Sequence, residues 1–142
     1  MGSIAIASDH TGVGLKAQLK DHLTSLGHTV IDLGPDDTAS VDYPDYADKL
    51  AAALAAQHAD RGVLICGSGI GISIAANRHR HIRAALCHDG LSAKLSRQHN
   101  DANVLVLGAR LIGSETAKDC ATAFFSTPFE GGRHQNRVSK LC

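Results

Sequence analysis

The residues best suited to chemistry lie in one short stretch, where a cysteine is followed directly by a glycine-rich loop. An apolar run, Val63-Leu64-Ile65, ends at Cys66, and the loop Gly67-Ser68-Gly69-Ile70-Gly71 comes next. An apolar, helix-like segment then runs to about Asn77. A strand that turns through glycines into a helix places its last side chain at the carboxyl edge of a sheet, where open α/β folds bind ligands. The same turn directs backbone N–H groups and a helix N-terminus at that point, which favours an anion. The pattern indicates a thiol beside an anion cradle.

Spacing alone leaves the role of Cys66 open. Free cysteine is often a small buried hydrophobe, and this is our interpretation of Cys87 and Cys120. Cys66 differs because it stands at a strand end before a helix N-terminus, where a thiolate is favoured. A structural cysteine and a reacting one are both compatible with this position.

The glycine loop does not match the common nucleotide-binding patterns. A dinucleotide fingerprint needs a glycine at position 72, where Ile72 stands, and a P-loop needs a lysine that is missing here. The loop still forms a nest of N–H groups for a single anion or oxyanion. It therefore offers candidate substrate-binding positions at Gly67, Gly69, Ile70 and Gly71.

Two further polar motifs have both a structural and a functional interpretation. Asp9-His10-Thr11-Gly12 follows the first apolar run. Asp9 or Thr11 can cap a helix there, or Asp9 can bind hydroxyls while His10 binds a phosphate or carries a proton. His99-Asn100-Asp101 is compatible with a polar turn at a helix C-terminus and with a site.

A basic cluster near the end of the chain also has two interpretations. Arg133 and Arg137 are four residues apart, on one face if this segment is helical. They form either a solvated tail or a two-arginine phosphate clamp. The run Arg78-His79-Arg80-His81 is typical of a solvated loop.

Short apolar runs alternate with helical patterns along the whole chain, which predicts a parallel sheet with helices on both faces. We expect an α/β fold, a three-layer α/β/α sandwich with a five-stranded parallel sheet, Rossmann-like, in a single domain over residues 1–142. The expected strands are Ser3–Ser8, Thr29–Leu33, Arg61–Cys66, Ile82–Cys87 and Asn103–Leu107. The expected helices are Gly14–Leu26, Tyr43–Gln57, the segment ending at Asn77, Leu91–Gln98, Ser114–Phe125 and a short helix near the end. In this topology Asp9, His10, Cys66 and Ser68 converge at one edge of the sheet.

Composition excludes several classes of protein. The 142 residues are 44% hydrophobic and carry a formal net charge of zero, with a pI of about 7.1. Bulk charge therefore provides no attraction to nucleic acid or an anionic membrane. No apolar run reaches the roughly 18 residues of a membrane helix, and the N-terminus is not typical of a signal peptide. The four cysteines lack metal or redox spacing, so we expect a reduced, cytoplasmic protein with no metal.

Taken together, the motifs resemble one family, the type B ribose-5-phosphate isomerases, which include the allose-6-phosphate and galactose-6-phosphate isomerases. The resemblance covers almost the whole chain. It rests on six motifs in one order: Ala7–Gly12, Asp42–Ala47, Cys66–Asn77, Leu95–Asn103, Gly108–Arg110 and Phe129–Val138.

The resemblance implies an aldose–ketose isomerase that needs no cofactor and acts on a sugar phosphate through an enediolate. Cys66 resembles the general base that moves the proton between C1 and C2. Ser68, where members often have threonine, would hydrogen-bond the developing oxyanion with the loop amides. His99 resembles the residue that opens the furanose ring. Another branch uses a glutamate base after the loop, but Ile72 occupies that position here.

The resemblance also implies residues for substrate binding and a mode of assembly. Asp9 would hold sugar hydroxyls, and His10, Arg133 and Arg137 resemble phosphate ligands. Asn100 and Arg110 would complete the site. Members of the family are homodimers or homotetramers with sites shared between subunits, so His99, Asn100 and Arg110 would come from the neighbouring chain. A hexose-6-phosphate isomerase and a non-catalytic sugar-phosphate-binding subunit remain the alternatives.

Overall fold

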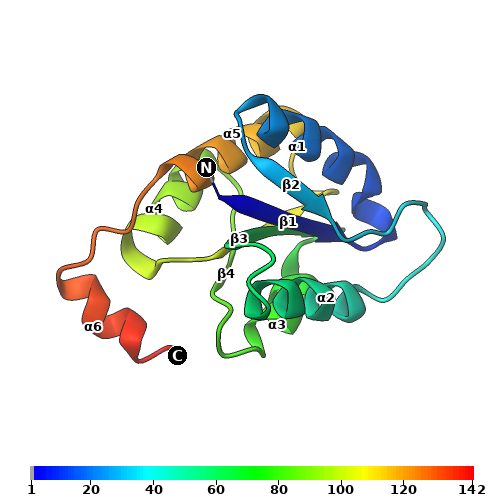
Figure 1. Ribbon diagram of the computed structural model, residues 1–142. Helices are drawn as coiled ribbons and strands as arrows, with labels where there is room; N and C mark the ends of the chain where they lie inside the picture. Colours follow the sequence, from blue (N-terminus) through cyan, green and yellow to red (C-terminus); the bar gives the residue numbers. More distant parts are fainter. Residues whose placement is uncertain (1) are drawn as a thin grey trace.

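The computed structural model describes residues 2–142 and contains one five-stranded, all-parallel sheet (Figure 1). The strands run in the order β2-β1-β3-β5-β4. Their bounds are β1 Ser3–Ser8, β2 Thr29–Asp32, β3 Arg61–Cys66, β4 Ala84–Leu86 and β5 Val104–Gly108. The expected three-layer α/β/α architecture is confirmed. The chain passes from β3 to the edge strand β4 and then returns to place β5 between them.

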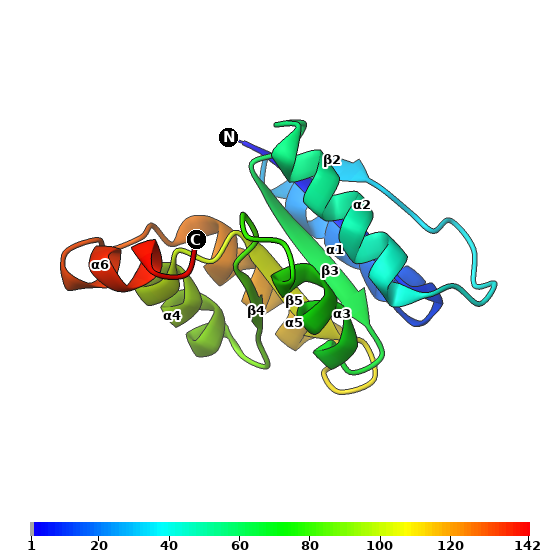
Figure 2. The same ribbon diagram turned by 90° about the horizontal axis from the view of Figure 1, so that it is seen from below.

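Helices cover both faces of the sheet, as Figure 2 shows from a second direction. The helices are α1 Val13–Ser25, α2 Tyr43–Ala55, α3 Ile70–Asn77, α4 Gly90–Asn100, α5 Ser114–Ser126 and α6 Arg133–Ser139, with a 3-10 turn η1 at His10–Gly12. Helices α2 and α3 pack on one face, and α1, α4 and α5 share the core of the other.

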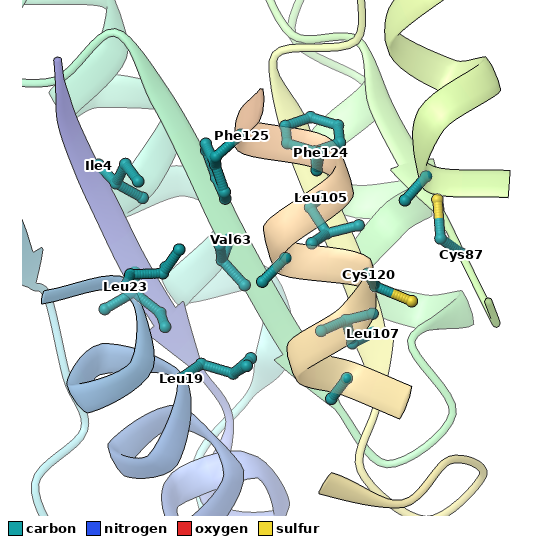
Figure 3. Packing of buried hydrophobic residues seen from close by; sticks show 14 of the residues in the cluster. Ile4, Leu19, Leu23, Val63, Cys87, Leu105, Leu107, Cys120, Phe124 and Phe125 are labelled. Atoms are coloured by element: carbon teal, nitrogen blue, oxygen red, sulfur yellow. The ribbon is translucent and has the colours of Figure 1, made fainter. Parts of the chain in front are cut away.

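The central strands are apolar on both sides because both faces are covered, as expected for parallel strands. Val63 and Ile65 of β3 point into the core of α1, α4 and α5, whereas Leu64 and Cys66 point toward α2 and α3. Figure 3 shows the first of these cores, where Phe124 of α5 and Leu19 of α1 lie against the sheet. The alternation places the Cys66 side chain on the α2/α3 face.

Two expected elements are shorter than the sequence pattern predicted. The apolar segment Ile82–Cys87 forms a strand only over Ala84–Leu86. This strand lies at the sheet edge and has one neighbour, β5, so fewer of its residues are held by ladder bonds. The Asn77 side chain bonds both backbone groups of Ala84 at 2.8 and 3.0 Å and fixes the strand entrance. Helix α2 ends at Ala55, before Gln57 with its positive φ of 60°.

The last helix, α6, lies outside the two helical layers and packs against α4 (Figures 1 and 2). Its buried side chains are His134 and Val138. The amide of Glu130 donates to the carbonyl of Gln98 at 3.1 Å and ties the preceding loop to the end of α4. The expected short helix near the end of the chain is confirmed, and its position is fixed by α4.

Candidate active site

A cavity of about 490 Å³ opens at the carboxyl ends of β1 and β3. Its walls come from the segments after β1, β3 and β5 and from the start of α2. The lining residues are Asp9, His10, Thr11, Tyr43, Cys66, Gly67, Ser68, Ile70, Gly71 and Arg110. The expected convergence of Asp9, His10, Cys66 and Ser68 is therefore confirmed within one chain.

Cys66 ends β3 with its side chain inside the protein, 4% exposed. The backbone N–H of Gly69 donates a hydrogen bond to its Sγ at 3.2 Å. Helix α3 begins at the next residue, Ile70, so the sulfur also lies close to the positive end of the helix dipole. A hydrogen-bond donor and a helix N-terminus therefore both face the sulfur, the atom that would act as a base or nucleophile.

Two glycines make the shape of the loop after Cys66 possible, one within the loop and one in the neighbouring strand β5. Gly69 has a φ of +78°, and a Cβ there would lie 2.5 Å from Leu86 Cδ1. A Cβ on Gly108, at the end of β5, would lie 2.5 Å from the carbonyl oxygen of Ser68. The amides of Ala109 and Arg110 donate to the carbonyls of Cys66 and Gly67 at 2.9 Å. The β5 end therefore holds the glycine loop by direct backbone contact.

Two of the loop amides expected to bind an anion already donate hydrogen bonds to side chains of the loop. The Gly69 amide bonds Cys66 Sγ, and the Ile70 amide donates to Ser68 Oγ at 3.1 Å. The following amides of the first turn of α3, beginning with Gly71, have no partner inside the helix. Because Ser68 Oγ uses a lone pair for Ile70, its hydroxyl hydrogen remains available to a ligand oxygen.

Asp9 combines the capping role and the cavity position that the sequence left as alternatives. Its Oδ1 accepts hydrogen bonds from Thr11 N at 2.9 Å and Thr11 Oγ1 at 2.6 Å. Both bonds use Oδ1, so Oδ2 remains available to a hydroxyl donor. The side chain is held in one orientation at the cavity wall before any ligand arrives.

His10 is oriented by the loop that leads into α2. The backbone N–H of Val41 donates to His10 Nδ1 at 3.2 Å. Because Nδ1 accepts this bond, the proton of the neutral ring lies on Nε2. His10 therefore presents an N–H donor at the cavity, which suits a phosphate or hydroxyl oxygen.

The position of Arg110 differs from the one that the family resemblance implied. The family resemblance assigned it to a neighbouring chain, but it lines the cavity of its own chain. A Cβ on Gly67 would lie 3.4 Å from Arg110 Cδ, which places the side chain over the glycine loop. Arg110 lies there because it comes two residues after Gly108, the end of β5, which pairs with Cys66.

The other predicted site residues lie at the opposite edge of the sheet. Helix α4 starts after β4 at the carboxyl edge and runs back to the start of β5, so His99 and Asn100 reach the amino edge. Asn100 lines a separate cavity of about 380 Å³ together with Arg83 and Leu141. Arg133 and Arg137 belong to α6, which packs on α4. One chain therefore does not bring these four residues to Cys66.

His99 has neighbours that the sequence analysis did not single out. Its ring stacks on that of His134, with centroids 4.5 Å apart and planes at 18°. Glu130 Oε1 lies 3.9 Å from His99 Nε2 and 3.6 Å from His134 Nε2. Burial lowers the pKa of His134, and His99 and Arg133 lower it further, against the opposing effect of Glu130. Nothing in sequence spacing links His99 to residues 130 and 134, because the link is the docking of α6 on α4.

Tyr43 and Thr11 also line the cavity without having been predicted as site residues. Both lie in motifs that the sequence places at the carboxyl edge. Tyr43 packs on the first turn of α3, since a Cβ on Gly71 would lie 2.6 Å from its Cζ. The sequence signal for Tyr43 was an aromatic residue between Asp42, at the N-cap position of α2, and Pro44.

The fold and the cavity define an α/β enzyme with a buried thiol, oriented hydrogen-bond donors and an arginine at the carboxyl edge of a parallel sheet. Comparison with protein families makes the class specific. Residues 4–141 match the family described as "Ribose/Galactose Isomerase". The chain belongs to this family of sugar-phosphate isomerases.

Individual relatives are similar in sequence to this chain over nearly their whole length. Ribose-5-phosphate isomerase B of Escherichia coli is 48% identical over 141 residues, covering 99% of this chain and 95% of the relative. D-erythrulose-4-phosphate isomerase of Pectobacterium atrosepticum is 44% identical over 142 residues, covering 99% and 93%. Relatives at similar identity therefore carry names with different sugar phosphates.

Solved structures share the fold closely. A ribose 5-phosphate isomerase from Thermotoga maritima matches with a TM-score of 0.96 at 51% identity, covering 99% of this chain and 97% of that one. Ribose-5-phosphate isomerase B from Mycoplasma genitalium, with bound ribulose-5-phosphate, matches with a TM-score of 0.93 at 42% identity, covering 98% and 93%. Among residues 2–142 of this chain, no helix is both long and apolar enough to cross a membrane.

Proposed function

We propose that residues 1–142 form one catalytic domain that interconverts ribose 5-phosphate and ribulose 5-phosphate, with Cys66 as the general base. The observation that carries this proposal is the Cys66 sulfur, which accepts the Gly69 N–H at 3.2 Å at the wall of the cavity beside the glycine loop. Relatives named for this activity, and one of them with the ketose phosphate bound, support the choice of substrate.

The reaction needs a proton to move between two carbons. The Cys66 thiolate takes the proton from C2 of the open-chain aldose, and the C–H electron pair forms the C1–C2 double bond of the enediolate. The carbonyl electrons move onto O1. The thiol then returns the proton to C1, where the electrons of the C1–C2 double bond form the new C–H bond. O2 releases its proton and becomes the ketone oxygen, and O1 takes up a proton and becomes the hydroxyl, so protons and electrons balance overall. A positioned base contributes about 10²–10⁴-fold to such a step.

The donors around Cys66 fit the charge that develops on oxygen. The Ser68 hydroxyl and the first-turn amides of α3 stabilise the enediolate oxygen, where each preorganised donor contributes roughly 3–4 kcal/mol. Asp9, held by Thr11, accepts from sugar hydroxyls. Arg110 adds positive charge over the loop.

We further propose that a second copy of the chain completes each site with His99, Asn100, Arg133 and Arg137. These residues lie at the edge opposite to Cys66 within one chain, while the phosphate end of the substrate and the ring-opening step require them. Exposed apolar side chains provide the surface for such a dimer: Ile70, Ile74, Leu91, Leu95, Leu111 and Leu141. In this arrangement His99 protonates and deprotonates the furanose oxygens during ring opening.

Subunit complementation tests both proposals together. Cys66→Ala and His99→Asn chains are each expected to be inactive, and co-refolding them in equal amounts is expected to restore about a quarter of wild-type activity, because half the dimers carry one intact shared site. A mixture that stays as inactive as its components while forming mixed dimers would show that the two residues do not act in a site shared between chains. Wild-type turnover of ribose 5-phosphate is the control.

A further inference from the structure

A compact group of ligating side chains joins α4 to α6, outside the cavity that contains Cys66. We call it the α4–α6 cluster. It consists of His99 at the end of α4, Glu130 in the connecting loop and His134 in the first turn of α6. One ligand atom from each residue lies within 4.8 Å of the other two.

Backbone hydrogen bonds hold the three residues of the cluster close together. The Glu130 amide is bonded to the Gln98 carbonyl at 3.1 Å, and the His134 amide to the Gly131 carbonyl at 3.0 Å. His134 is only 8% exposed, and its ring stacks on His99. The backbone therefore keeps both histidines beside the Glu130 carboxylate.

We propose that the α4–α6 cluster binds a divalent transition-metal ion of the zinc class through His99, Glu130 and His134, with water in the open position. Two imidazoles and one carboxylate are an established ligand set for Zn²⁺ with an open fourth position. Zn–N bonds of 2.0–2.1 Å place tetrahedral ligand atoms about 3.3–3.4 Å apart. The separations of 3.9 and 3.6 Å to Glu130 Oε1 must close by about 0.2–0.6 Å. The two imidazole nitrogens, which lie within 4.8 Å of each other, must also approach as the rings turn out of their stacked arrangement.

The charges around the cluster set the character of the site. His134 lies in the first turn of α6, next to Arg133 and three residues before Arg137. The positive charges of Arg133 and Arg137, which act on the same histidine, oppose a divalent cation. The site therefore binds metal reversibly, and the fold does not depend on it.

Metal binding has a consequence that rests on the proposed function. If His99 opens the sugar ring in the partner's cavity, a metal ion on His99 Nε2 removes that acid–base group. The ion would then inhibit isomerisation reversibly, and chelation would restore it. The cluster would make the enzyme sensitive to zinc although the proposed chemistry uses no metal.

The direct test measures binding without any assay of activity. Chelator-treated protein is titrated with Zn²⁺ by calorimetry and with Co²⁺ by visible absorption. We expect a single Co²⁺ site per chain with four-coordinate d–d bands, no sulfur charge-transfer band, and Zn²⁺ competition for it. Glu130→Gln, at a half-exposed position, is expected to lower affinity by at least roughly 10–100-fold. Glu115→Gln, 90% exposed and on α5, is the matched control and should bind as the wild type does.

Any one of three results would overturn the inference. The folded wild type could bind neither Zn²⁺ nor Co²⁺, the Co²⁺ spectrum could show a thiolate ligand, or Glu130→Gln and His134→Gln could both keep the wild-type affinity. If the protein isomerises ribose 5-phosphate but binds no metal, the metal site fails and the proposed function stands. If metal binds at the cluster and activity is unaffected, the inhibitory role is refuted.

Discussion

Gly69→Ala is the substitution that tests how the glycine loop positions the thiol. An alanine at a φ of +78° costs about 1–2 kcal/mol in backbone energy. Its Cβ would also lie 2.5 Å from Leu86 Cδ1 and 3.0 Å from the carbonyl carbon of Leu107, and such overpacking costs about 1–3 kcal/mol. We therefore expect a loss of about 2–5 kcal/mol in the free energy of unfolding, with a Tm at least about 6 °C lower.

The same substitution should impair catalysis if the loop moves to relieve the clash. The Gly69 N–H would then leave Cys66 Sγ, and a hydrogen bond to a charged group is worth about 1.5–3 kcal/mol. This loss corresponds to a decrease in kcat of roughly 10–100-fold. The assay is ribose 5-phosphate turnover at a temperature where circular dichroism shows the variant folded.

Gly14→Ala is the matched control for this experiment. Gly14 lies in α1, where an added Cβ would point into open space, and alanine there should stabilise the helix by about 0.5–1 kcal/mol. Both variants are compared at one protein concentration, because association affects apparent stability. Wild-type stability together with wild-type kcat in Gly69→Ala would refute the reasoning.

Three further predictions concern the rest of the chain. Ser68→Ala should lower kcat by about 10²–10³-fold while Ser68→Thr, which keeps the hydroxyl, stays active, as steady-state kinetics will show. Lys16→Met breaks the buried pair with Asp32 at 2.6 Å and the bond to the Pro35 carbonyl at 2.9 Å, which does not titrate and whose loss persists at low pH. It should destabilise by about 1–3 kcal/mol near pH 7, less than for a fully buried pair because Asp32 is 21% exposed. Burial raises the pKa of Asp32, but the hydrogen bond from Lys16 and its charge outweigh this and lower the pKa overall, so the stability difference should shrink in urea titrations as pH falls below about 4; a difference that does not shrink there would contradict this assignment. Near neutral pH, iodoacetamide should label the exposed Cys142 in the native protein and spare Cys120, whose pKa burial raises to about 12; mass spectrometry that found Cys120 labelled first would refute its buried state.

The sequence was sufficient to predict the layers and the cavity that Asp9 and Cys66 line. Alternating apolar runs and helical patterns indicated a parallel sheet, and strand ends bearing Asp9 and Cys66 had to meet at one edge. The strand order was not predictable, because the position of β5 between β3 and β4 depends on long-range pairing. That position explains why Arg110 lies over the glycine loop of its own chain.

The positions of the other predicted site residues depend on contacts that local sequence does not encode. His99 and Arg133 belong to elements that leave the sheet at its other edge, and only association of chains would bring them to Cys66. Glu130 and His134 were missed for a related reason. Their proximity to His99 is a product of how α6 docks on α4.

The most direct test of the account is turnover of ribose 5-phosphate by wild-type protein and by Cys66→Ala, both in EDTA, with allose 6-phosphate and galactose 6-phosphate assayed beside it. We expect the wild type to isomerise the pentose phosphate, and the folded variant to bind it while kcat falls by about 10²–10⁴-fold. Wild-type kcat in Cys66→Ala would contradict the role of this thiol, and a wild type that turns over only a hexose phosphate would contradict the proposed substrate.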